Sequence, residues 1–245
     1  MALPKVDVPT YELTLPSVDE KVKFRPFLVK EEKILYVAME TGDSKEMVNS
    51  LKEIVNACTF EKLNVDNLPI FDIEYIFLQL RAKSVAEISK FRTICPDDGK
   101  TYAEVEVDLT KVDVEVDDNH TNKIVIDEKR QLGVVLKYPT LKNYDVGKGL
   151  DNVSVEKTFD ILIDCIDHIY EGDKIYPAKD STKEELKEFI ELLPQEAFTK
   201  VKGFFDTMPK LKHKIEVTNP KTKVTSPVVL QGIGDFFELA SPTTR

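Results

Sequence analysis

Apolar residues recur at helical spacing through the first part of the chain. They form one stripe over residues 28–41 and a second stripe that ends at Cys58. Gly42, between the two stripes, suits the left-handed residue that ends a helix, and Asp43 suits the N-cap of the next one. The pattern therefore predicts two consecutive helices, with Cys58 as a buried small hydrophobe.

Residues 66–88 form the most apolar long helix candidate. Apolar side chains cover most of its circumference, which is typical of a helix buried on most sides. We expect it to be the central helix of the N-terminal half. Asp72 and Glu74 are unusual in such a helix, because a buried carboxylate needs a partner. Arg81 near its polar end is a candidate partner, and simple helix termination is the other interpretation of that end.

Between residues 90 and 136 the apolar period changes to two. Five short segments there combine β-branched residues with alternating charges, which is typical of strands with one wet face. We expect these segments to form one antiparallel sheet. They are Phe91–Ile94, Tyr102–Val107, Val112–Val116, Lys123–Asp127 and Gly133–Leu136.

Helical spacing returns after residue 151. A helix is predicted over Val155–Tyr170, a second over Lys183–Leu193 behind the capping box of Thr182 and Glu185, and a third from Pro194. Two further strands, Lys212–Val217 and Val224–Leu230, are expected to form a hairpin. The predicted fold is therefore α+β, with N-terminal helices, a central antiparallel sheet and C-terminal helices.

The same pattern divides the chain into five parts. The first carries four prolines and is expected to be an extended arm that packs on its own domain or reaches a neighbouring subunit. The last is expected to pack back on the β-rich part. The parts are the arm (1–27), an N-terminal helical part (28–89), a β-rich part (90–150), a C-terminal helical part (151–211) and a hairpin with a tail (212–245).

Composition excludes several classes of protein. A net charge of -10 disfavours a nucleic-acid scaffold, because binding a polyanion needs clustered positive charge. No apolar run is long enough to span a membrane, and no secretory pattern opens the sequence. Three widely separated cysteines do not make a disulfide framework. We therefore expect a protein of the cytoplasm.

The sequence contains no phosphate-binding loop and no hydrolase signature. Asp160, Asp164 and Asp167 would share one face of the predicted 155–170 helix beside His168, and paired carboxylates can do acid–base work. The alternative is the solvated face of an ordinary amphipathic helix. His120 lies among acidic residues and is expected to occupy a solvated turn.

Two hairpin turns share an unusual pattern. Residues 95–100 have the frame Cys-Pro-x-x-Gly-Lys, with Asp98 where a zinc knuckle has its second cysteine. The turn of the second hairpin echoes it, with Asn219 and Thr222 at the ligand positions. Cys95 would be the one cysteine left of four, which makes a poor zinc site. We therefore predict a metal-free, degenerate zinc-ribbon-like pair of hairpins, with no metal and no cofactor.

Residues 23–33 and 71–85 resemble the T4-like bacteriophage tail baseplate hub proteins, a group that holds a hub subunit and a hub assembly factor. Shorter runs at 137–139, 208–211 and 232–237 fit the same order, so the resemblance covers nearly the whole chain. It implies a non-enzymatic role in building the baseplate, in the host cytoplasm during assembly or in the virion tail. It also implies cysteine pairs at the two hairpins, where this sequence departs from the pattern.

The implied partners are other baseplate hub and tail proteins, without nucleic acid, membrane or a small-molecule substrate. Arg25 between Phe24 and Phe27 is an aromatic-flanked guanidinium, a residue type enriched at interfaces. The alternative is that the two phenylalanines enter the core. The further candidates for partner binding are Arg81, Lys83 and Ser84 at the end of the 66–88 helix, and Phe236 and Phe237 in an apolar C-terminal segment.

Three functions are compatible with these features. The resemblance favours a hub component or hub assembly factor that acts through protein–protein contacts. An adaptor or chaperone of another complex would differ from it only in its partner. A small metal-dependent hydrolase would have to use the acidic residues near His168 together with Cys95.

Overall fold

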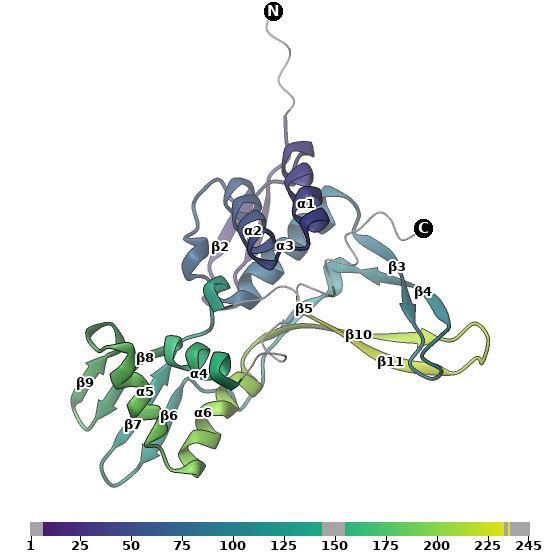
Figure 1. Cartoon of the computed structure of the whole chain (residues 1–245). Helices are drawn as coiled ribbons and strands as arrows, with labels where there is room; N and C mark the ends of the chain where they lie inside the picture. The colour runs from purple at the N-terminus through teal and green to yellow at the C-terminus, as the bar shows by residue number, and fades with distance from the viewer. Residues whose placement is uncertain (1–6, 144–154, 233–234, 236–245) are drawn as a thin grey trace, which may run out of the picture. The chain divides into compact units, whose positions relative to one another are not determined.

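The computed structural model describes residues 7–143, 155–232 and 235 (Figure 1). These residues form six α-helices and several antiparallel sheets, so the expected α+β fold is confirmed. The chain divides into two compact units. Unit 1 comprises the described residues up to Glu115 and from Lys210 onward, and unit 2 comprises those from Val116 to Pro209.

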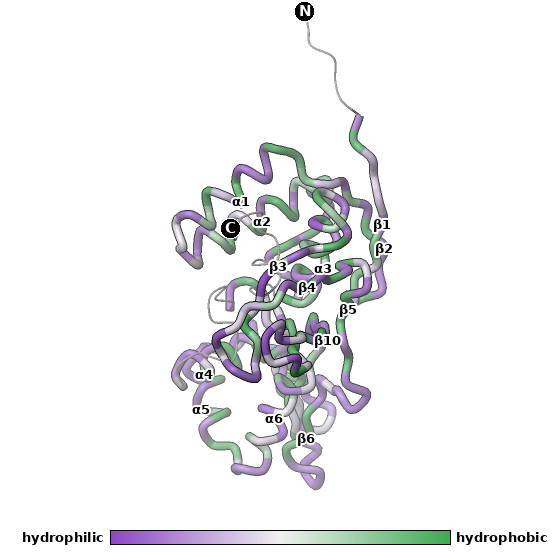
Figure 2. Tube along the Cα trace, turned by 90° about the vertical axis from the view of Figure 1, so that its right-hand side faces the viewer, coloured by the Kyte–Doolittle hydropathy of each residue, from purple (hydrophilic) through white to green (hydrophobic). Residues whose placement is uncertain are grey.

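Unit 1 contains three helices and three small sheets. Its helices are α1 (Val29–Thr41), α2 (Ser44–Cys58) and α3 (Ile70–Ser84). Its strands are β1 (Tyr11–Thr14), β2 (Lys21–Phe24), β3 (Ile88–Ile94), β4 (Tyr102–Asp108), β5 (Asp113–Glu115), β10 (Lys210–Thr218) and β11 (Thr225–Gln231). Figure 2 shows apolar and polar positions interspersed along the helices, as expected where one face of each covers a core.

The helix ends of unit 1 follow the sequence closely. Gly42 ends α1 with φ 63, in the left-handed region that a residue without a Cβ adopts at little cost. The Asp43 carboxylate accepts a hydrogen bond from the Lys45 N–H and caps α2. Cys58 is fully buried, as predicted. Both helix boundaries in this region were therefore predictable from local chemistry.

The N-terminal arm packs on its own unit. β1 and β2 pair antiparallel, and Leu13 and Phe24 are buried. The Ser17 N–H donates to Oδ1 of Asp72 at 3.0 Å, and the Ser17 hydroxyl donates to Oδ2 of the same carboxylate. Asp72 is fully buried, and a buried carboxylate needs hydrogen-bond donors. Ser17 supplies them. The arm, rather than Arg81, therefore supplies the hydrogen bonds that Asp72 accepts.

Two hairpins pack face to face beside α3. β3 pairs with β4, and β10 pairs with β11 on one side and β5 on the other. Their inner faces and α3 enclose one apolar core, which holds Leu78, Val105, Val107, Leu211, Ile215 and Val217. The predicted hairpin near the C-terminus is therefore confirmed.

The prediction of a single central sheet over residues 90–136 is wrong. Strands form in all five predicted regions, but they belong to three different sheets. β5, for example, pairs with β10, which comes about a hundred residues later in the chain. Alternation shows which face of a strand is buried, but it carries no information on the partner.

Unit 2 is a four-stranded antiparallel sheet packed against three helices. The strands β6 (Lys123–Asp127), β7 (Leu132–Leu136), β8 (Ile166–Glu171) and β9 (Lys174–Pro177) follow one another in that order. The helices are α4 (Val155–Asp164), α5 (Lys183–Glu191) and α6 (Gln195–Thr207). Their apolar faces enclose a core with Ile124, Val134, Leu162, Val201 and Phe204.

The prediction of one helix over residues 155–170 is correct only for its first part. It ends at Asp164, and β8 begins at Ile166 and pairs with β7. Leu162, Ile163, Ile166 and Tyr170 fall on one face at helical spacing, so the apolar pattern predicted a helix that continues past Asp164. Asp167 and His168 therefore lie on a strand. The capping box of Thr182 and Glu185 is confirmed at the start of α5.

Candidate functional site: paired hairpin loops and a groove in unit 2

The turns of the two hairpins in unit 1 meet at their tips. Asn219 is fully buried, and its Nδ2 donates to both carboxylate oxygens of Asp97, at 3.0 and 3.1 Å. The same amide reaches Oδ2 of Asp98 at 3.0 Å, and the Thr222 hydroxyl donates to Asp97 at 2.6 Å. We call these four residues the loop junction. The repeated turn pattern in the sequence marks Asp98, Asn219 and Thr222 as ligand positions, and the fold brings these three residues together.

Each loop is also ordered from within. Oδ1 of Asp98 accepts the N–H groups of Lys100 and Thr101, both at 2.9 Å. Oδ1 of Asn219 accepts the N–H groups of Lys221 and Thr222, at 2.8 and 3.2 Å. Such turns present a side-chain oxygen to backbone donors and leave the rest of the side chain pointing outward. In this protein the outward-pointing atoms, Nδ2 of Asn219 and Oδ2 of Asp98, link the two hairpins.

Hydrogen bonding favours the charged form of both carboxylates. The pKa of Asp98 is lowered well below its usual range, chiefly by the Thr101 hydroxyl and by the backbone N–H groups of the turn. The pKa of Asp97 is lowered by the Thr222 hydroxyl and then by the Asn219 amide. Both groups are therefore expected to be ionised when they accept these bonds.

The donor set at the loop junction does not fit a zinc ion. Zinc is held by several ligands with free lone pairs, chiefly thiolates and imidazoles in structural sites. Cys95 is fully buried, and its pKa is raised by burial and by the charges of Asp97 and Asp98. The carboxylates already accept an amide and a hydroxyl. Within the described ranges, no group of three or more His, Cys, Asp or Glu residues could hold a metal ion.

The proposed partner-binding residues of unit 1 take part in its packing. Phe24 and Phe27 are buried, and Nη2 of Arg25 lies 2.8 Å from Oε1 of the buried Glu31. The Ser84 hydroxyl accepts the N–H of Phe27 at 2.9 Å. Arg81 is also buried, and Lys83 forms an ion pair with Glu87. These positions favour the structural interpretation, and their role in partner binding stays a prediction. Phe236 and Phe237 lie outside the described residues.

The acidic face expected on the 155–170 helix does not exist. Asp160 forms an ion pair with Lys183 at 3.0 Å, and Asp164 accepts a hydrogen bond from Asn143 at 3.1 Å. Asp167, on β8, contacts Nδ1 of His168 at 2.7 Å. Since the helix ends before Asp167, the common face on which the hydrolase hypothesis rested is not formed.

His120 does not occupy a solvated turn. Its Nδ1 lies 3.0 Å from the Thr207 hydroxyl, and its Nε2 lies 3.0 Å from the Tyr138 hydroxyl. Its ring also packs against Tyr138 and Phe204, with centroids at 5.6 and 5.1 Å. The sequence did not reveal these contacts of His120, because its partners lie on distant segments and no local pattern points to them.

Acid is expected to weaken unit 2 through His120. Burial lowers the pKa of His120, although Asp117 opposes the shift. As the pH falls below about 6.5, the unfolded state binds a proton that the folded state resists, so the free energy of unfolding decreases. Hydrogen exchange measured between pH 8 and 5 should show this loss in residues 117–138 and in α6. His120→Gln should flatten the pH dependence; a slope equal to that of the wild type would contradict the assignment.

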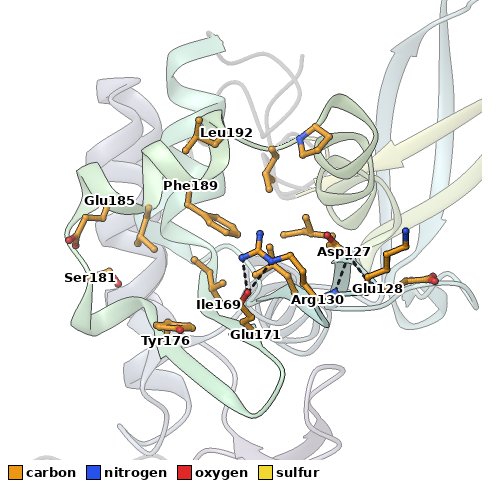
Figure 3. A pocket seen from close by; sticks show the side chains of 16 residues that line it. Asp127, Glu128, Arg130, Ile169, Glu171, Tyr176, Ser181, Glu185, Phe189 and Leu192 are labelled. Carbon is orange, nitrogen blue, oxygen red and sulfur yellow. Dashed lines mark hydrogen bonds and ion pairs between the residues drawn. The ribbon is translucent and has the colours of Figure 1, made fainter.

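A groove of about 950 Å³ lies in unit 2 between α5, the start of α6 and the β6–β7 turn (Figure 3). Ile169, Phe189 and the largely exposed Leu192 supply apolar surface. Across it, Nη2 and Nε of Arg130 hold Oε1 of Glu171 at 2.7 and 3.1 Å. Residues from several separate elements line this groove, so no motif in the sequence marks it.

Three of the four acids that line this groove serve the fold. Oδ1 of Asp127 accepts the N–H groups of Lys129 and Arg130, at 2.8 and 3.1 Å, and so orders the turn. Glu185 completes the capping box of α5. The groove therefore presents an apolar surface with structured charges around it, which suits contact with another protein better than acid–base chemistry.

The comparisons with known proteins give one match. The family model described as "T4 bacteriophage base plate protein" matches residues 8–238. No curated protein and no solved structure matches the chain. Among the residues that the structure describes, no helix has the length and the apolar character needed to cross a membrane.

Proposed function

We propose that this chain, which belongs to the T4 bacteriophage base plate protein family, is a non-enzymatic hub component or hub assembly factor. The observation that carries the proposal is the family match over residues 8–238, nearly the whole chain. It makes the protein a phage baseplate protein. The narrower assignment to the hub is supported by the resemblance of residues 23–33 and 71–85 to hub proteins.

The side-chain chemistry supports a role without catalysis. Acids of unit 1 and unit 2 that could do acid–base work cap turns, link hairpins or pair with cations, as at Asp98, Asp127 and Glu171. The partners we propose are other baseplate hub and tail proteins, in the host cytoplasm during assembly. A net charge of -10 makes nucleic acid an unsuitable partner.

Mass spectrometry of purified virions and of baseplate intermediates would test this proposal. The copy number should be calibrated against the tail-tube protein. A stoichiometric signal in virions would identify a hub component, and a signal in intermediates alone would identify an assembly factor. Absence from both preparations would overturn the proposal and favour an adaptor of another complex.

A further inference from the structure

The chain enters and leaves unit 2 at neighbouring points. β5 ends at Glu115 and β10 begins at Lys210, and these two residues pair across the two strands. The described residues between them belong to unit 2. One connection therefore runs from Glu115 to the start of β6, and the other is formed by the end of α6.

His120 anchors the first of these connections. From Glu115 to Lys123, every residue except His120 is exposed. The ring of His120 packs against Tyr138 and Phe204, and its Nδ1 lies 3.0 Å from the hydroxyl of Thr207, the last residue of α6. The segment by which the chain enters unit 2 is thus joined to the helix by which the chain leaves it.

The hydrogen-bond network places the proton of the neutral ring. The Thr207 hydroxyl donates to the C=O of Gly203, one turn earlier in α6, at 2.8 Å. Its oxygen is therefore an acceptor toward the ring, which assigns the proton to Nδ1. Nε2 then accepts the hydroxyl proton of Tyr138 across 3.0 Å. In this form the ring bonds to both neighbouring elements.

A second proton disfavours the packed position of the ring. Burial lowers the pKa of His120, and the charge of Asp117 opposes the shift. Because the packed ring resists protonation, protonation favours states in which the ring is exposed. The elements around the ring carry further charged residues in the entering turn, beside Tyr138 and in the last two turns of α6: Asp118, Lys137, Lys202 and Asp206.

We infer that His120 is a pH-sensitive clasp at the entry to unit 2. The neutral ring fastens the entering segment to the end of α6. The protonated ring releases both, which leaves the residues from Val116 to Lys123 without a side-chain anchor. The loss of stability expected in acid therefore begins as a local opening at these two ends of unit 2. The clasp goes beyond the proposed function and does not depend on it.

Nuclear magnetic resonance of the full chain, labelled with nitrogen-15 in its histidine rings, would test the assignment of the proton. The signals of His120 are those that disappear in His120→Gln. At pH 8 we expect a protonated Nδ1 and an unprotonated Nε2. A proton on Nε2, or rapid averaging of the two tautomers as in a free imidazole, would contradict the clasp.

Hydrogen exchange of the same protein at pH 8 and pH 5 would test the opening. The N–H of His120 donates to the C=O of Asp117, and the N–H of Met208 donates to the C=O of Phe204, both at 2.9 Å. After correction for the intrinsic rates, both amides should exchange at least about tenfold faster at pH 5, whereas α5, β8 and β9 keep their protection. Loss of protection at only one of the two amides, at neither, or equally throughout unit 2 would overturn the inference.

A matched pair of variants isolates the bond to Thr207. Thr207→Val removes the acceptor of Nδ1 and should speed the exchange of both amides at pH 8, where the ring is neutral. Thr199→Val is the control, because the Thr199 hydroxyl makes the same kind of bond within α6, to the C=O of Gln195 at 2.9 Å. The control should behave as the wild type does. If the two variants exchange alike, the bond between His120 and Thr207 holds nothing closed and the inference fails.

Discussion

Asn219→Asp is expected to destabilise unit 1 at neutral pH by about 3 kcal/mol, the size expected when an uncompensated charge is left in a buried position. The wild-type amide is fully buried and donates to the carboxylates of Asp97 and Asp98. The substitution removes that donor with almost no change in shape. It also places a third carboxylate where two already converge. The two hairpins should therefore separate at their tips.

Asn219→Ala separates the two contributions. It removes the same donor without adding charge, so it should cost about 1–3 kcal/mol, the range for an unsatisfied buried polar group. Chemical unfolding, together with hydrogen exchange of β3, β4, β10 and β11, would measure both variants. If the aspartate variant proves no less stable than the alanine variant, the loop junction is not the charged network described here.

The two proteins should respond to acid in opposite directions. In the wild type the pKa values of Asp97 and Asp98 are lowered by folding, so their contribution is present above about pH 4 and is lost as the pH falls. In Asn219→Asp, mutual repulsion should raise the pKa of at least one carboxylate. The variant should then be relatively more stable near pH 4 than at pH 7.

Local chemistry was enough to predict most helices, but not the partners of the strands. Gly42, Asp43 and the pair Thr182 and Glu185 act within a few residues of their own positions, and the sequence displays such signals directly. The pairing of β5 with β10 depends on which apolar faces meet in the folded chain. That choice depends on the whole unit, so alternation alone led to one sheet where several exist.

The candidate sites also separate into features that local sequence predicts and features that depend on the whole fold. The loop junction was half predictable, because a repeated turn pattern marked Asp98, Asn219 and Thr222 before any contact was known. Asp97 was missed, since nothing in the frame distinguishes it from its neighbour. His120 and the groove beside α5 join residues from distant elements. Sites of that kind appear only when the topology is known.

Arg25→Ala is expected to cost about 3 kcal/mol of stability in unit 1, because it leaves a buried carboxylate without its main partner. Glu31 is 1% exposed, and Arg25 is its guanidinium partner at 2.8 Å. The same carboxylate accepts the N–H of Leu28 at 2.8 Å and so helps to begin α1. Loss of Arg25 should therefore also increase hydrogen exchange in the first turn of α1.

The pH dependence shows whether the loss is electrostatic. Burial alone would raise the pKa of Glu31, but the hydrogen bonds from Arg25 and Leu28 outweigh it and hold the pKa below its ordinary value. The wild type therefore keeps this contribution above about pH 4.5 and loses it as the pH falls. Without Arg25, burial should prevail, and the variant should gain stability relative to the wild type as the pH falls.

The double variant Arg25→Ala/Glu31→Gln makes that test decisive. The glutamine can still accept the Leu28 N–H but carries no charge, so it should recover much of the lost stability and remove the pH dependence. Chemical unfolding at pH 7 and pH 4 would measure both proteins. A double variant as unstable as Arg25→Ala would mean that Arg25 acts by packing beside Phe24 and Phe27, and the ion pair would then have no part in holding the arm against α1.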